Sequence, residues 1–476
     1  MQWKPDRAFP LSLHEQIYNW ISARIRQGEW TIGTKLPSQR KLSEMLEVNR
    51  STIIQVLEEL KANGILETQR GGGTYVSNSS WNKLLSHEQP NWHKHIDASI
   101  HEPNYHTIQL INEHEQNASM IRLGTGELSP DLLPTALLEQ SLQNISLFAR
   151  DIGYSEPKGN KKLRIALSGH LQKRGINTSP ESILIVSGAL QALQLISLGI
   201  LEQRSNVFQE PPSYLNSIHP FQSAGMRVIS VSREQQLKKT LKALKGKKQS
   251  LFYTVPTLNN PSGRILTMED RQALLDICTS LQIPIIEDDV YHELTFEDAP
   301  PSMKSMDHSG QVLYIGSVSK TLSPGLRIGW VVAPEPVINR LADIKMQTDY
   351  GSSAFSQQIV THWLTSGLYD SHVGRLRCQL QRRAAFVEEI LTKDFGQLAS
   401  WEKPKGGFYI WLRFNEPIVN KALFQQLIKQ KLLINPGYIY DPKDFHHIRL
   451  SYAYATLEEL KQGLHILLNV VAQKSS

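Results

Sequence analysis

The sequence has few cysteines and no long apolar segment, and these absences exclude several classes of protein. Two cysteines, Cys278 and Cys378, occur in 476 residues, so neither a disulfide framework nor a cysteine-based metal site is expected. The longest apolar run, residues 183–201, is interrupted by Ser187, Gly188 and other polar residues, which argues against a transmembrane helix. The N-terminus carries no apolar signal segment. We therefore expect a soluble, cytoplasmic protein.

No long block of like charge is present either, so the charge pattern does not indicate an acidic or basic tail. The formal net charge of +6 permits a nucleic-acid partner without requiring one. The length corresponds to about three domain-sized units. A hydrophobic content of 40% is enough for large cores.

Residues 1–78 have the pattern of a small helical unit that ends in a hairpin. Apolar spacing and turn residues predict three helices and two strands, at about residues 13–25, 39–46, 50–63, 65–68 and 74–76. Ser38 is a favourable N-cap for the second helix, and Asn49 or Arg50 opens the third. The short turn between these two helices predicts a helix-turn-helix, and the glycine-rich hairpin after it predicts a wing.

The third predicted helix begins with polar residues, whereas its apolar stripe faces inward. Because recognition helices contact base edges with their N-terminal residues, this polar end is suited to DNA. The segment LPSQRKLSEMLEVNRSTIIQVLEELKANGIL and the wing after it strongly resemble the GntR-type winged helix over its whole length. The resemblance implies that five residues contact DNA: Arg40, Arg50, Ser51, Thr52 and Arg70.

Residues 79–117 are rich in Asn, His, Gln, Glu and Ser, which indicates a polar linker with at most one short helix. The linker contains six of the sixteen histidines. They lack helical i, i+4 pairing and neighbouring cysteines, so we predict no metal site there.

Residues 118–476 predict an α/β unit with a mostly parallel, helix-covered sheet and a small C-terminal subdomain from about residue 341. The evidence is an alternation of helical stretches with β-rich apolar runs at residues 183–186, 207–208, 228–231, 251–255, 283–286 and 312–315. In open α/β sheets, chemistry is placed at the carboxyl ends of the strands. The residues that follow each run are therefore the candidates for a site.

Lys320 follows the last of these runs and is the central candidate. Hydroxyl groups at Thr321 and Ser323 and the guanidinium of Arg327 follow it closely, a grouping that suits an aldehyde cofactor with a phosphate. Pyridoxal phosphate is such a cofactor and is held by a lysine Schiff base. The Ser-x-Ser-Lys motif alone is equally consistent with a surface lysine after a strand.

The other strand ends favour the cofactor. Residues 187–191 open a helix whose free N–H groups suit a phosphate, and Tyr214 can stack on a planar ring. Asn260 can donate to a phenolate oxygen, as can Tyr291. Asp288 can keep a pyridine nitrogen protonated. Each group alone has an ordinary structural explanation, but their recurrence at successive strand ends predicts one site.

These residues also resemble fold-type I aminotransferases over nearly the whole of residues 118–476. LGTGELSPDLLP, GYSEPKGNKKLR, SVSKTLSPGLRIGW, GGFYIWL and IRLSYA occur in the order of that family. The resemblance implies that Lys320 forms the Schiff base and that Arg449 binds a substrate carboxylate. It implies cofactor contacts from Ala189, Leu190, Tyr214, Asn260, Asp288, Tyr291, Ser317, Ser319 and Arg327. Tyr154 matches a residue that crosses into the partner subunit's site, which implies a homodimer.

A GntR-type winged helix joined to an aminotransferase-like unit resembles the MocR-like, or GabR-like, transcriptional regulators. We accordingly expect a pyridoxal-phosphate-dependent regulator that binds an operator in double-stranded DNA. An amino acid or related amine is expected to act as effector by displacing Lys320 from the cofactor, with slow or absent turnover. Two alternatives remain: a working aminotransferase with a DNA-binding head, and a DNA-binding scaffold in which Lys320 is idle.

Overall fold

The computed structural model describes residues 3–7, 9–69, 73–77, 105–144, 153–232, 237–246 and 248–475. The chain forms two compact units, residues 1–100 and residues 101–476. Within the described ranges, every helix is too short or too polar to cross a membrane.

The described part of the first unit contains three helices with side-chain caps, α1 (Leu13–Arg26), α2 (Gln39–Leu46) and α3 (Arg50–Ala62). The hydroxyl of Ser38 accepts the Lys41 amide at 3.2 Å and so begins α2. The Asn49 side chain accepts the Ser51 amide at 3.1 Å and so begins α3. The predicted cap Ser38 is confirmed, and of the two residues predicted to open the third helix, Asn49 is its N-cap.

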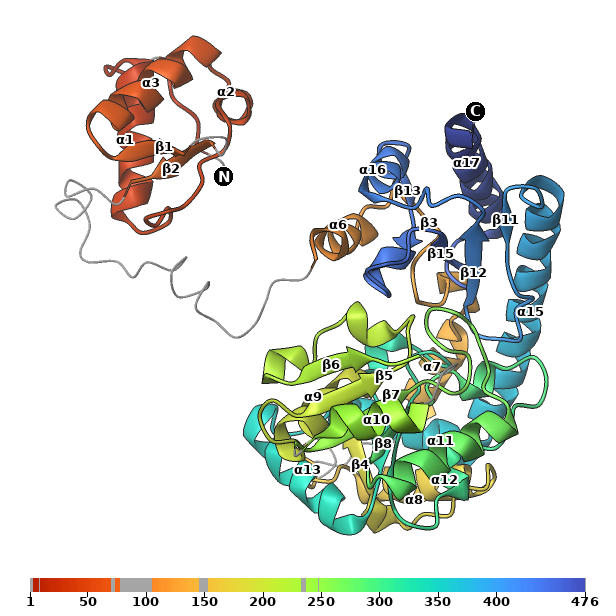
Figure 1. Ribbon diagram of the computed structural model, residues 1–476. Helices are drawn as coiled ribbons and strands as arrows, with labels where there is room; N and C mark the ends of the chain where they lie inside the picture. Colours follow the sequence, from red (N-terminus) through yellow and green to blue (C-terminus); the bar gives the residue numbers. More distant parts are fainter. Residues whose placement is uncertain are drawn as a thin grey trace. The chain divides into compact units, whose positions relative to one another are not determined.

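The predicted wing is an antiparallel hairpin of β1 (Leu66–Gln69) and β2 (Gly73–Val76). Apolar residues of all three helices and both strands form one core, which includes Ile21, Leu42, Leu57 and Leu66. The packed helices and hairpin of Figure 1, drawn in red and orange, are a winged helix. Arg70, the predicted wing contact, lies outside the described residues.

The large subdomain of the second unit is built on a seven-stranded sheet with the order β4-β10-β9-β8-β7-β5-β6. Its strands are β4 (Ile183–Val186), β5 (Asn206–Gln209), β6 (Arg227–Ser230), β7 (Ser250–Thr254), β8 (Ile285–Asp288), β9 (Val312–Ser317) and β10 (Gly329–Val332). All neighbouring pairs are parallel except the two that involve β10. The predicted, mostly parallel sheet is therefore confirmed. Strand β10 is not among the strands that the sequence predicts.

Helices cover both faces of this sheet, which explains why strands such as β4 are apolar at every position (Figure 1). Leu184 and Val186 pack with α9 and α13, whereas Ile183 and Ile185 pack with α8 and α14. The helices of this subdomain are α7 (Thr135–Asn144), α8 (Lys161–Gln172), α9 (Ala189–Gly199), α10 (Leu237–Lys245), α11 (Met268–Ser280), α12 (Met303–Met306), α13 (Glu335–Thr348) and α14 (Ala354–Ser366).

The small subdomain packs two helices, α15 (Leu368–Asp394) and α17 (Leu457–Ser475), against a four-stranded sheet with the order β11-β12-β15-β14. The strands of this sheet are β11 (Ala399–Ser400), β12 (Tyr409–Phe414), β14 (Asn435–Pro436) and β15 (His447–Ser451). Helix α16 (Lys421–Lys429) and strand β13 (Leu432–Leu433), which lies outside this sheet, also belong to the small subdomain. The sequence predicts that this subdomain begins near residue 341. The structure differs, because α13 and α14 pack with the large sheet and the small-subdomain core starts within α15.

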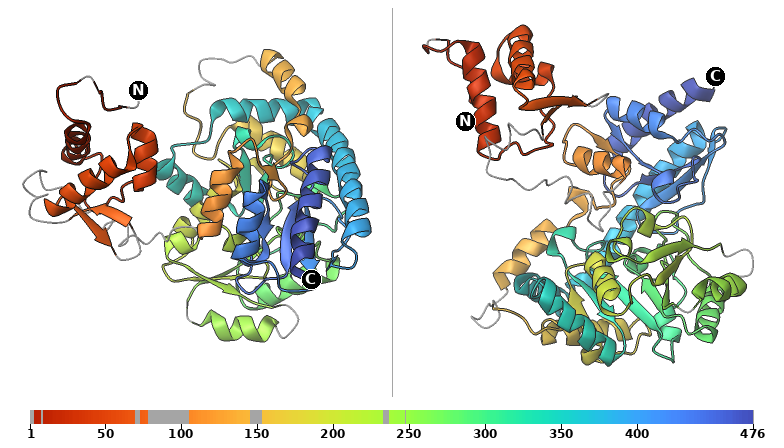
Figure 2. Two further views of the ribbon diagram at one scale, coloured as in Figure 1. Left: turned by 90° about the horizontal axis from the view of Figure 1, so that it is seen from above. Right: turned by 60° about the vertical axis from the view of Figure 1, so that its left-hand side comes forward.

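An N-terminal segment also joins the small subdomain. Helix α6 (His106–Glu115) lies in the range assigned to the linker, but its Ile108 and Ile111 are buried in the small-subdomain core. Strand β3 (Ile121–Arg122) pairs in parallel with β13. Figure 2 shows α6, in orange, beside the blue elements of this subdomain, as does Figure 1. The helical part of the predicted linker is thus packed structure.

Candidate functional site

Lys320 lies in the segment that joins β9 to β10, at the end of the sheet where the parallel strands terminate. The two strands pair antiparallel, with Ser317 opposite Gly329. The Val318 amide donates to Ile328 O at 3.1 Å, so the segment is closed at its base. The Lys320 amine donates to Gly126 O at 2.6 Å. Because the pairing of β9 with β10 fixes both ends of this segment, the backbone of Lys320 is held in place.

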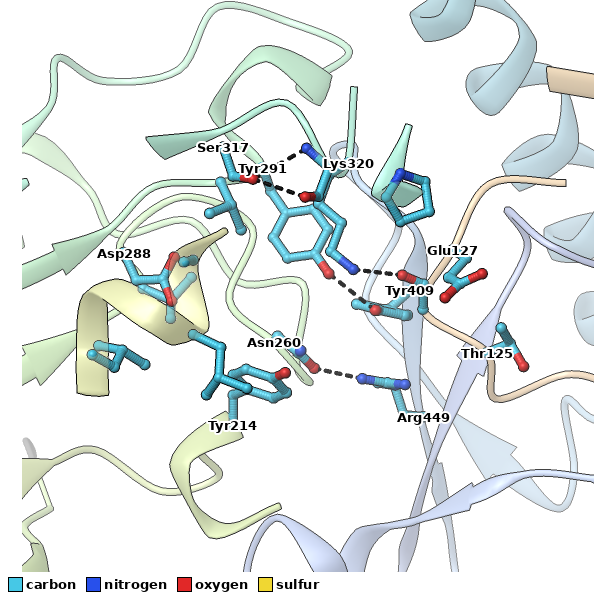
Figure 3. Close-up of a pocket in the computed structure, with 18 of the residues that line it drawn as sticks. Thr125, Glu127, Tyr214, Asn260, Asp288, Tyr291, Ser317, Lys320, Tyr409 and Arg449 are labelled. Carbon is cyan, nitrogen blue, oxygen red and sulfur yellow. Dashed lines mark hydrogen bonds between the residues drawn. The ribbon is translucent and has the colours of Figure 1, made fainter. Parts of the chain in front are cut away.

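A cavity of about 340 Å³ surrounds this amine, a volume within the range of small-molecule sites. Both subdomains of the second unit contribute walls. Figure 3 shows Asp288 on one side of the cavity and Thr125 and Glu127 on the other, with the side chain of Lys320 between them. Of the predicted residues, the cavity is lined by Ala189, Leu190, Tyr214, Asn260, Asp288, Tyr291, Ser317, Ser319, Lys320, Arg327 and Arg449.

Asp288, the last residue of β8, is a buried carboxylate with one oxygen unsatisfied. Its Oδ2 accepts the Tyr253 hydroxyl at 2.8 Å, whereas Oδ1 has no hydrogen-bond partner among the described residues. Burial raises the pKa of Asp288 to about 6, against the opposing effects of the Tyr253 hydrogen bond and the charge of Lys320. A buried acceptor without a partner is costly. The free oxygen fits a protonated ring nitrogen, which would supply the missing donor.

Arg327 and the start of α9 form a positively polarised corner. Gly188, the N-cap of α9, has φ 92°, and a Cβ at this position would lie 2.7 Å from Arg327 Nη2. Only glycine therefore lets the guanidinium approach the helix N-terminus, where Arg327 Nη2 donates to Ser187 O at 2.6 Å. Arg327 itself has φ 52°, a strained value for a residue with a side chain. Together with the helix dipole, this corner fits a phosphate.

Arg449 lies on β15 and reaches the cavity from the small subdomain. Its Nη1 donates to Asn260 Oδ1 at 2.8 Å, and its Nη2 donates to Gly124 O at 2.6 Å. The guanidinium carbon lies 4.1 Å from the ring centroid of Tyr409, a cation–π distance. Nε has no hydrogen-bond partner among the described residues. Because Asn260 accepts with its oxygen, its amide NH2 is left to donate.

Tyr291 and Tyr409 bring the two subdomains together within the cavity. Their hydroxyl oxygens lie 3.0 Å apart, and Figure 3 shows the pair beside the Lys320 amine. Burial raises the pKa of Tyr291 well above its ordinary value, so the hydroxyl keeps its proton and can donate. A Cβ on Gly126 would lie 2.4 Å from the Tyr409 hydroxyl, so a side chain at residue 126 would displace this hydroxyl.

Besides four apolar residues, six residues that line the cavity have no role in the sequence-based predictions. Tyr253 lies within the predicted strand at residues 251–255, which carries no motif, and Glu115 lies in the range predicted to be a linker. Thr125, Gly126 and Glu127 occur in LGTGELSP, and Tyr409 occurs in GGFYIWL, so the motifs were recognised but their side chains were not assigned. The sequence shows the motifs that contain these four residues. Only the fold shows that the four residues line the cavity.

Tyr154 is the predicted cofactor residue that does not line the cavity. Its side chain is 85% exposed, and its ring packs edge-on against that of Tyr350 with 4.9 Å between centroids. Tyr350 is also exposed. The structure therefore places Tyr154 on the surface of this chain, next to a second exposed tyrosine.

The predicted DNA contacts of the first unit lie on its surface. Arg50 and Ser51 are exposed at the start of α3, and Thr52 is half-buried. Arg40 on α2 is exposed and donates to Glu44 at 2.9 Å. Arg50 donates to the Gln39 side chain at 3.4 Å, so α2 and α3 present their polar groups on one connected surface. In the described part of the chain, no cluster of three metal-ligating side chains occurs.

Two family models match the chain in agreement with these two units. Residues 13–76 match the bacterial regulatory proteins of the gntR family. Residues 118–467 match aminotransferase class I and II. The second match covers most of the chain and contains every residue that lines the cavity except Glu115.

Curated relatives match this chain over nearly its whole length. The chain is 46% identical over 467 residues to YisV of Bacillus subtilis, an uncharacterised HTH-type transcriptional regulator, with 97% of this chain and 96% of the relative covered. It is 39% identical over 436 residues to NorG of Staphylococcus aureus, an HTH-type transcriptional regulator, with 90% and 98% covered.

Solved structures match the second unit. Kynurenine aminotransferase of Pyrococcus horikoshii, in complex with PMP, superposes with a TM-score of 0.74 and 28% identity, covering 79% of this chain and 96% of its own. A multiple substrate aminotransferase of Thermococcus profundus gives 0.75 and 25%, covering 81% and 99%. The fold expectation is therefore confirmed, and the chain belongs to the family of HTH-type transcriptional regulators that join a GntR winged helix to an aminotransferase class I and II domain.

Proposed function

We propose that this protein binds pyridoxal 5'-phosphate in the cavity at Lys320 and operator DNA through its first unit, and that an amino acid or related amine regulates its DNA binding. The observation that carries the proposal is the meeting of Lys320, Asp288 and Arg449 in one cavity. An amine, an unsatisfied buried carboxylate and a buried guanidinium are the groups that such a cofactor and an amino-acid ligand require.

Each part of the cavity would hold one part of the cofactor. The α9 N-terminus, Arg327, Ser317 and Ser319 would bind the phosphate, and Asp288 Oδ1 would accept from the ring nitrogen. Asn260 and Tyr291 would donate to the phenolate oxygen, and Tyr214 lines the wall where it would lie against the ring. When bound, the cofactor supplies an aldehyde carbon that a primary amine can attack.

Lys320 and Arg449 then define where an effector would bind. The Lys320 amine is the internal amine that an effector amine would replace, and Arg449 would bind the effector's carboxylate. Binding of that carboxylate would compete with the present contacts of Arg449 to Asn260 and Gly124, which come from different parts of the chain. An effector would thus alter contacts between the subdomains, and it would regulate DNA binding if the two arrangements differ in effector affinity.

The first unit would bind the DNA. Arg50, Ser51 and Thr52 are placed at the N-terminus of the recognition helix, where a winged helix contacts base edges. Arg40 lies on the exposed surface of α2 and would bind phosphate after exchanging its ion pair with Glu44. Arg70 remains a proposed wing contact.

We further propose a homodimer in which Tyr154 contributes to the partner's cavity. The support is the exposure of the Tyr154–Tyr350 pair, because exposed tyrosine rings are enriched at protein–protein interfaces. Covering both rings at an interface would remove this exposed apolar area. Sedimentation of the full chain tests the dimer.

The proposal is tested by following two signals in one titration. Candidate amino acids are added to the cofactor-loaded protein while the cofactor's visible absorbance and the operator affinity are measured together. A regulator should show both signals changing at the same ligand concentration, by roughly 5- to 150-fold in operator affinity. In Arg449→Ala, amino acids should lose most of this effect because their carboxylate has no partner.

A working aminotransferase is the second candidate, because Lys320, Asp288 and Arg449 are all present and the fold is that of aminotransferases. The same titration separates the two functions. With an acceptor ketoacid added, a change in absorbance at constant operator affinity, together with accumulation of the product ketoacid over many turnovers, would replace the regulatory function with the enzymatic one.

A further inference from the structure

Two carboxylates in the cavity wall have no role in holding the cofactor. Glu115 is the last residue of α6, and Glu127 follows β3. Both line the same cavity as Lys320 and Arg449. Figure 3 shows Glu127 on the side of the cavity away from Asp288, together with Thr125. This acidic wall is therefore separate from the carboxylate proposed to face the ring nitrogen.

No cation in the described part of the chain forms an ion pair with this wall. Among the described residues, neither Glu115 nor Glu127 forms an ion pair within 4.0 Å. Arg122 is close, but its Nη1 donates to the backbone oxygen of Glu115 at 2.6 Å and its guanidinium stacks 4.3 Å from the ring of Tyr454. The Glu115 carboxylate accepts from the Thr125 hydroxyl at 3.0 Å. Two acidic groups thus face the cavity without a cationic partner.

The electrostatic effect of this arrangement is visible at Glu115. Burial raises its pKa, and the neighbouring charge of Glu127 raises it further, while Thr125, Arg449 and Arg122 act in the opposite direction. Half-burial and the neighbouring carboxylate disfavour the charged form of Glu115, and a cation bound beside it would stabilise that form. The other cavity cations are already matched, since Arg327 is placed for the phosphate and Arg449 for a ligand carboxylate.

A ligand that contacts both Lys320 and Arg449 would lie next to this wall. Gly124 O accepts from Arg449 and Gly126 O accepts from Lys320, each at 2.6 Å. Residues 124–126 therefore connect the proposed carboxylate position to the proposed amine position. Thr125 and Glu127 belong to the same segment, so a ligand that spans the two anchors lies beside them. The unpartnered Nε of Arg449, which is only 5% exposed, marks the carboxylate end of this path.

We propose that the effector carries a second cationic group, so that its class is the basic amino acids, and that Glu115 and Glu127 bind this group. The inference rests on the proposed effector site at Lys320 and Arg449. An effector amine and carboxylate would take the two anchors, and a cationic side chain would supply the charge that the acidic wall lacks. A neutral side chain would leave both carboxylates unpaired, which gives the site its selectivity.

The test uses a pair of probes that differ in this charge. L-Lysine and L-norleucine have the same straight four-carbon side chain, but only lysine ends in an amine. Each is titrated into the cofactor-loaded, full-length protein, and the visible absorbance and operator affinity are recorded. L-Lysine should produce its half-maximal effect at a concentration roughly tenfold lower than L-norleucine, because a charge-assisted contact contributes about that much affinity.

Three variants test which carboxylates cause the preference for L-lysine over L-norleucine. In Glu115→Gln and Glu127→Gln, the preference for L-lysine should fall towards unity while the response to L-norleucine persists. Glu113→Gln is the matched control, because Glu113 is an exposed carboxylate on the same helix and does not line the cavity. It should retain the full preference.

Equal potency of L-lysine and L-norleucine in the wild type would overturn the inference while leaving the proposed effector site intact. Tighter binding of both probes to Glu115→Gln would also overturn it, because this would show that Glu115 competes with ligand carboxylates for Arg449. If neither probe, nor any other amino acid, changes the absorbance or operator affinity, the proposed function itself fails and the inference fails with it.

Discussion

The two units of this protein place their candidate functional groups in opposite environments. In the first unit the side chain of Arg40 is 83% exposed, and Arg50 is also exposed. In the second unit Asp288 and Arg449 are 4% and 5% exposed. A surface that must meet a large polyanion needs accessible cations, whereas a cofactor site gains strength from the low dielectric of a buried cavity. The two units therefore respond to substitution by different physical mechanisms.

The consequence of burial is clearest in three successive acidic residues at the end of β8. Burial raises the pKa of Glu287, which accepts the backbone amides of Met303 and Lys304. Burial also raises the pKa of Asp288, to about 6. At Asp289 burial acts in the same direction, but His292 and Arg174 outweigh it and lower the pKa. Neighbours in the fold, not residue type, decide which carboxylate keeps its charge.

The largest expected effect is the loss of covalent cofactor attachment in Lys320→Ala. After borohydride reduction, mass spectrometry should find the cofactor on Lys320 in the wild type and no adduct in the variant. DNA affinity without effector should persist, because the first unit has its own core. An adduct on another lysine would contradict the assignment, and loss of DNA binding would show that the two units do not respond separately.

A core substitution in the first unit should destabilise that unit and leave cofactor binding by the second unit unchanged. Leu57 on α3 is 1% exposed within that unit's core, so Leu57→Ala should destabilise the unit by about 2 to 5 kcal/mol. Calorimetry of the full chain should show an earlier transition for the first unit, while the cofactor's absorbance persists to the wild-type temperature. Simultaneous loss of both signals would mean that the units unfold together.

Asp288→Asn should stabilise the cofactor-free protein at neutral pH. An ordinary aspartate ionises near pH 3.8, whereas Asp288 ionises near 6. Between these values the folded chain binds a proton that the unfolded chain has lost, so stability falls as pH rises through this window. The shift corresponds to a cost of about 3 kcal/mol above pH 6, which the neutral amide avoids.

Urea unfolding of the cofactor-free wild type and Asp288→Asn at several pH values measures this cost. The stability difference between the two should be largest above pH 6 and should shrink as the pH approaches 4. Cofactor affinity should change in the other direction, because the variant cannot pair with a protonated ring nitrogen. A difference that does not depend on pH would show that Asp288 is not the titrating group.

The smallest expected effects distinguish two exposed arginines of the first unit. Arg50→Ala should lose roughly 1 to 3 kcal/mol of operator affinity and relax specificity at one base position. Arg40→Ala should weaken all DNA sequences alike and reduce the salt dependence of binding. Affinities for a panel of single-base operator variants at two salt concentrations measure both. If a chain without residues 1–78 binds the operator normally, the assignment of DNA binding to the first unit is wrong.

The sequence predicted those parts of the molecule in which local pattern and final position coincide. Ser38 and Asn49 begin helices because capping depends on residues within one turn. Asp288 and Lys320 were found because the ends of parallel strands meet at one edge of a sheet. Their roles at the cofactor stay predictions, although the fold does bring them into one cavity.

Other residues were missed because their position depends on contacts between distant segments. Glu115 lies at the end of α6, and only the packing of Ile108 and Ile111 in the small-subdomain core brings it to the cavity. Tyr253 gains its importance from a hydrogen bond to Asp288 across neighbouring strands. The start of the small subdomain was misplaced because the amphipathic pattern of α13 does not indicate which sheet it covers.

The hairpin of β9 and β10 constrains how this family member can change by mutation. Residues 318–328 carry both Lys320 and Arg327 and are closed at the base by the Val318–Ile328 hydrogen bond. An insertion or deletion there would change the spacing between the proposed amine anchor and the proposed phosphate anchor, which would have to fit one rigid ligand. If the proposed cofactor is bound, the length of this segment should therefore stay fixed in any descendant that keeps it, even where its apolar residues are exchanged. A change of length within residues 318–328 would be a simple genetic sign that cofactor binding has been abandoned.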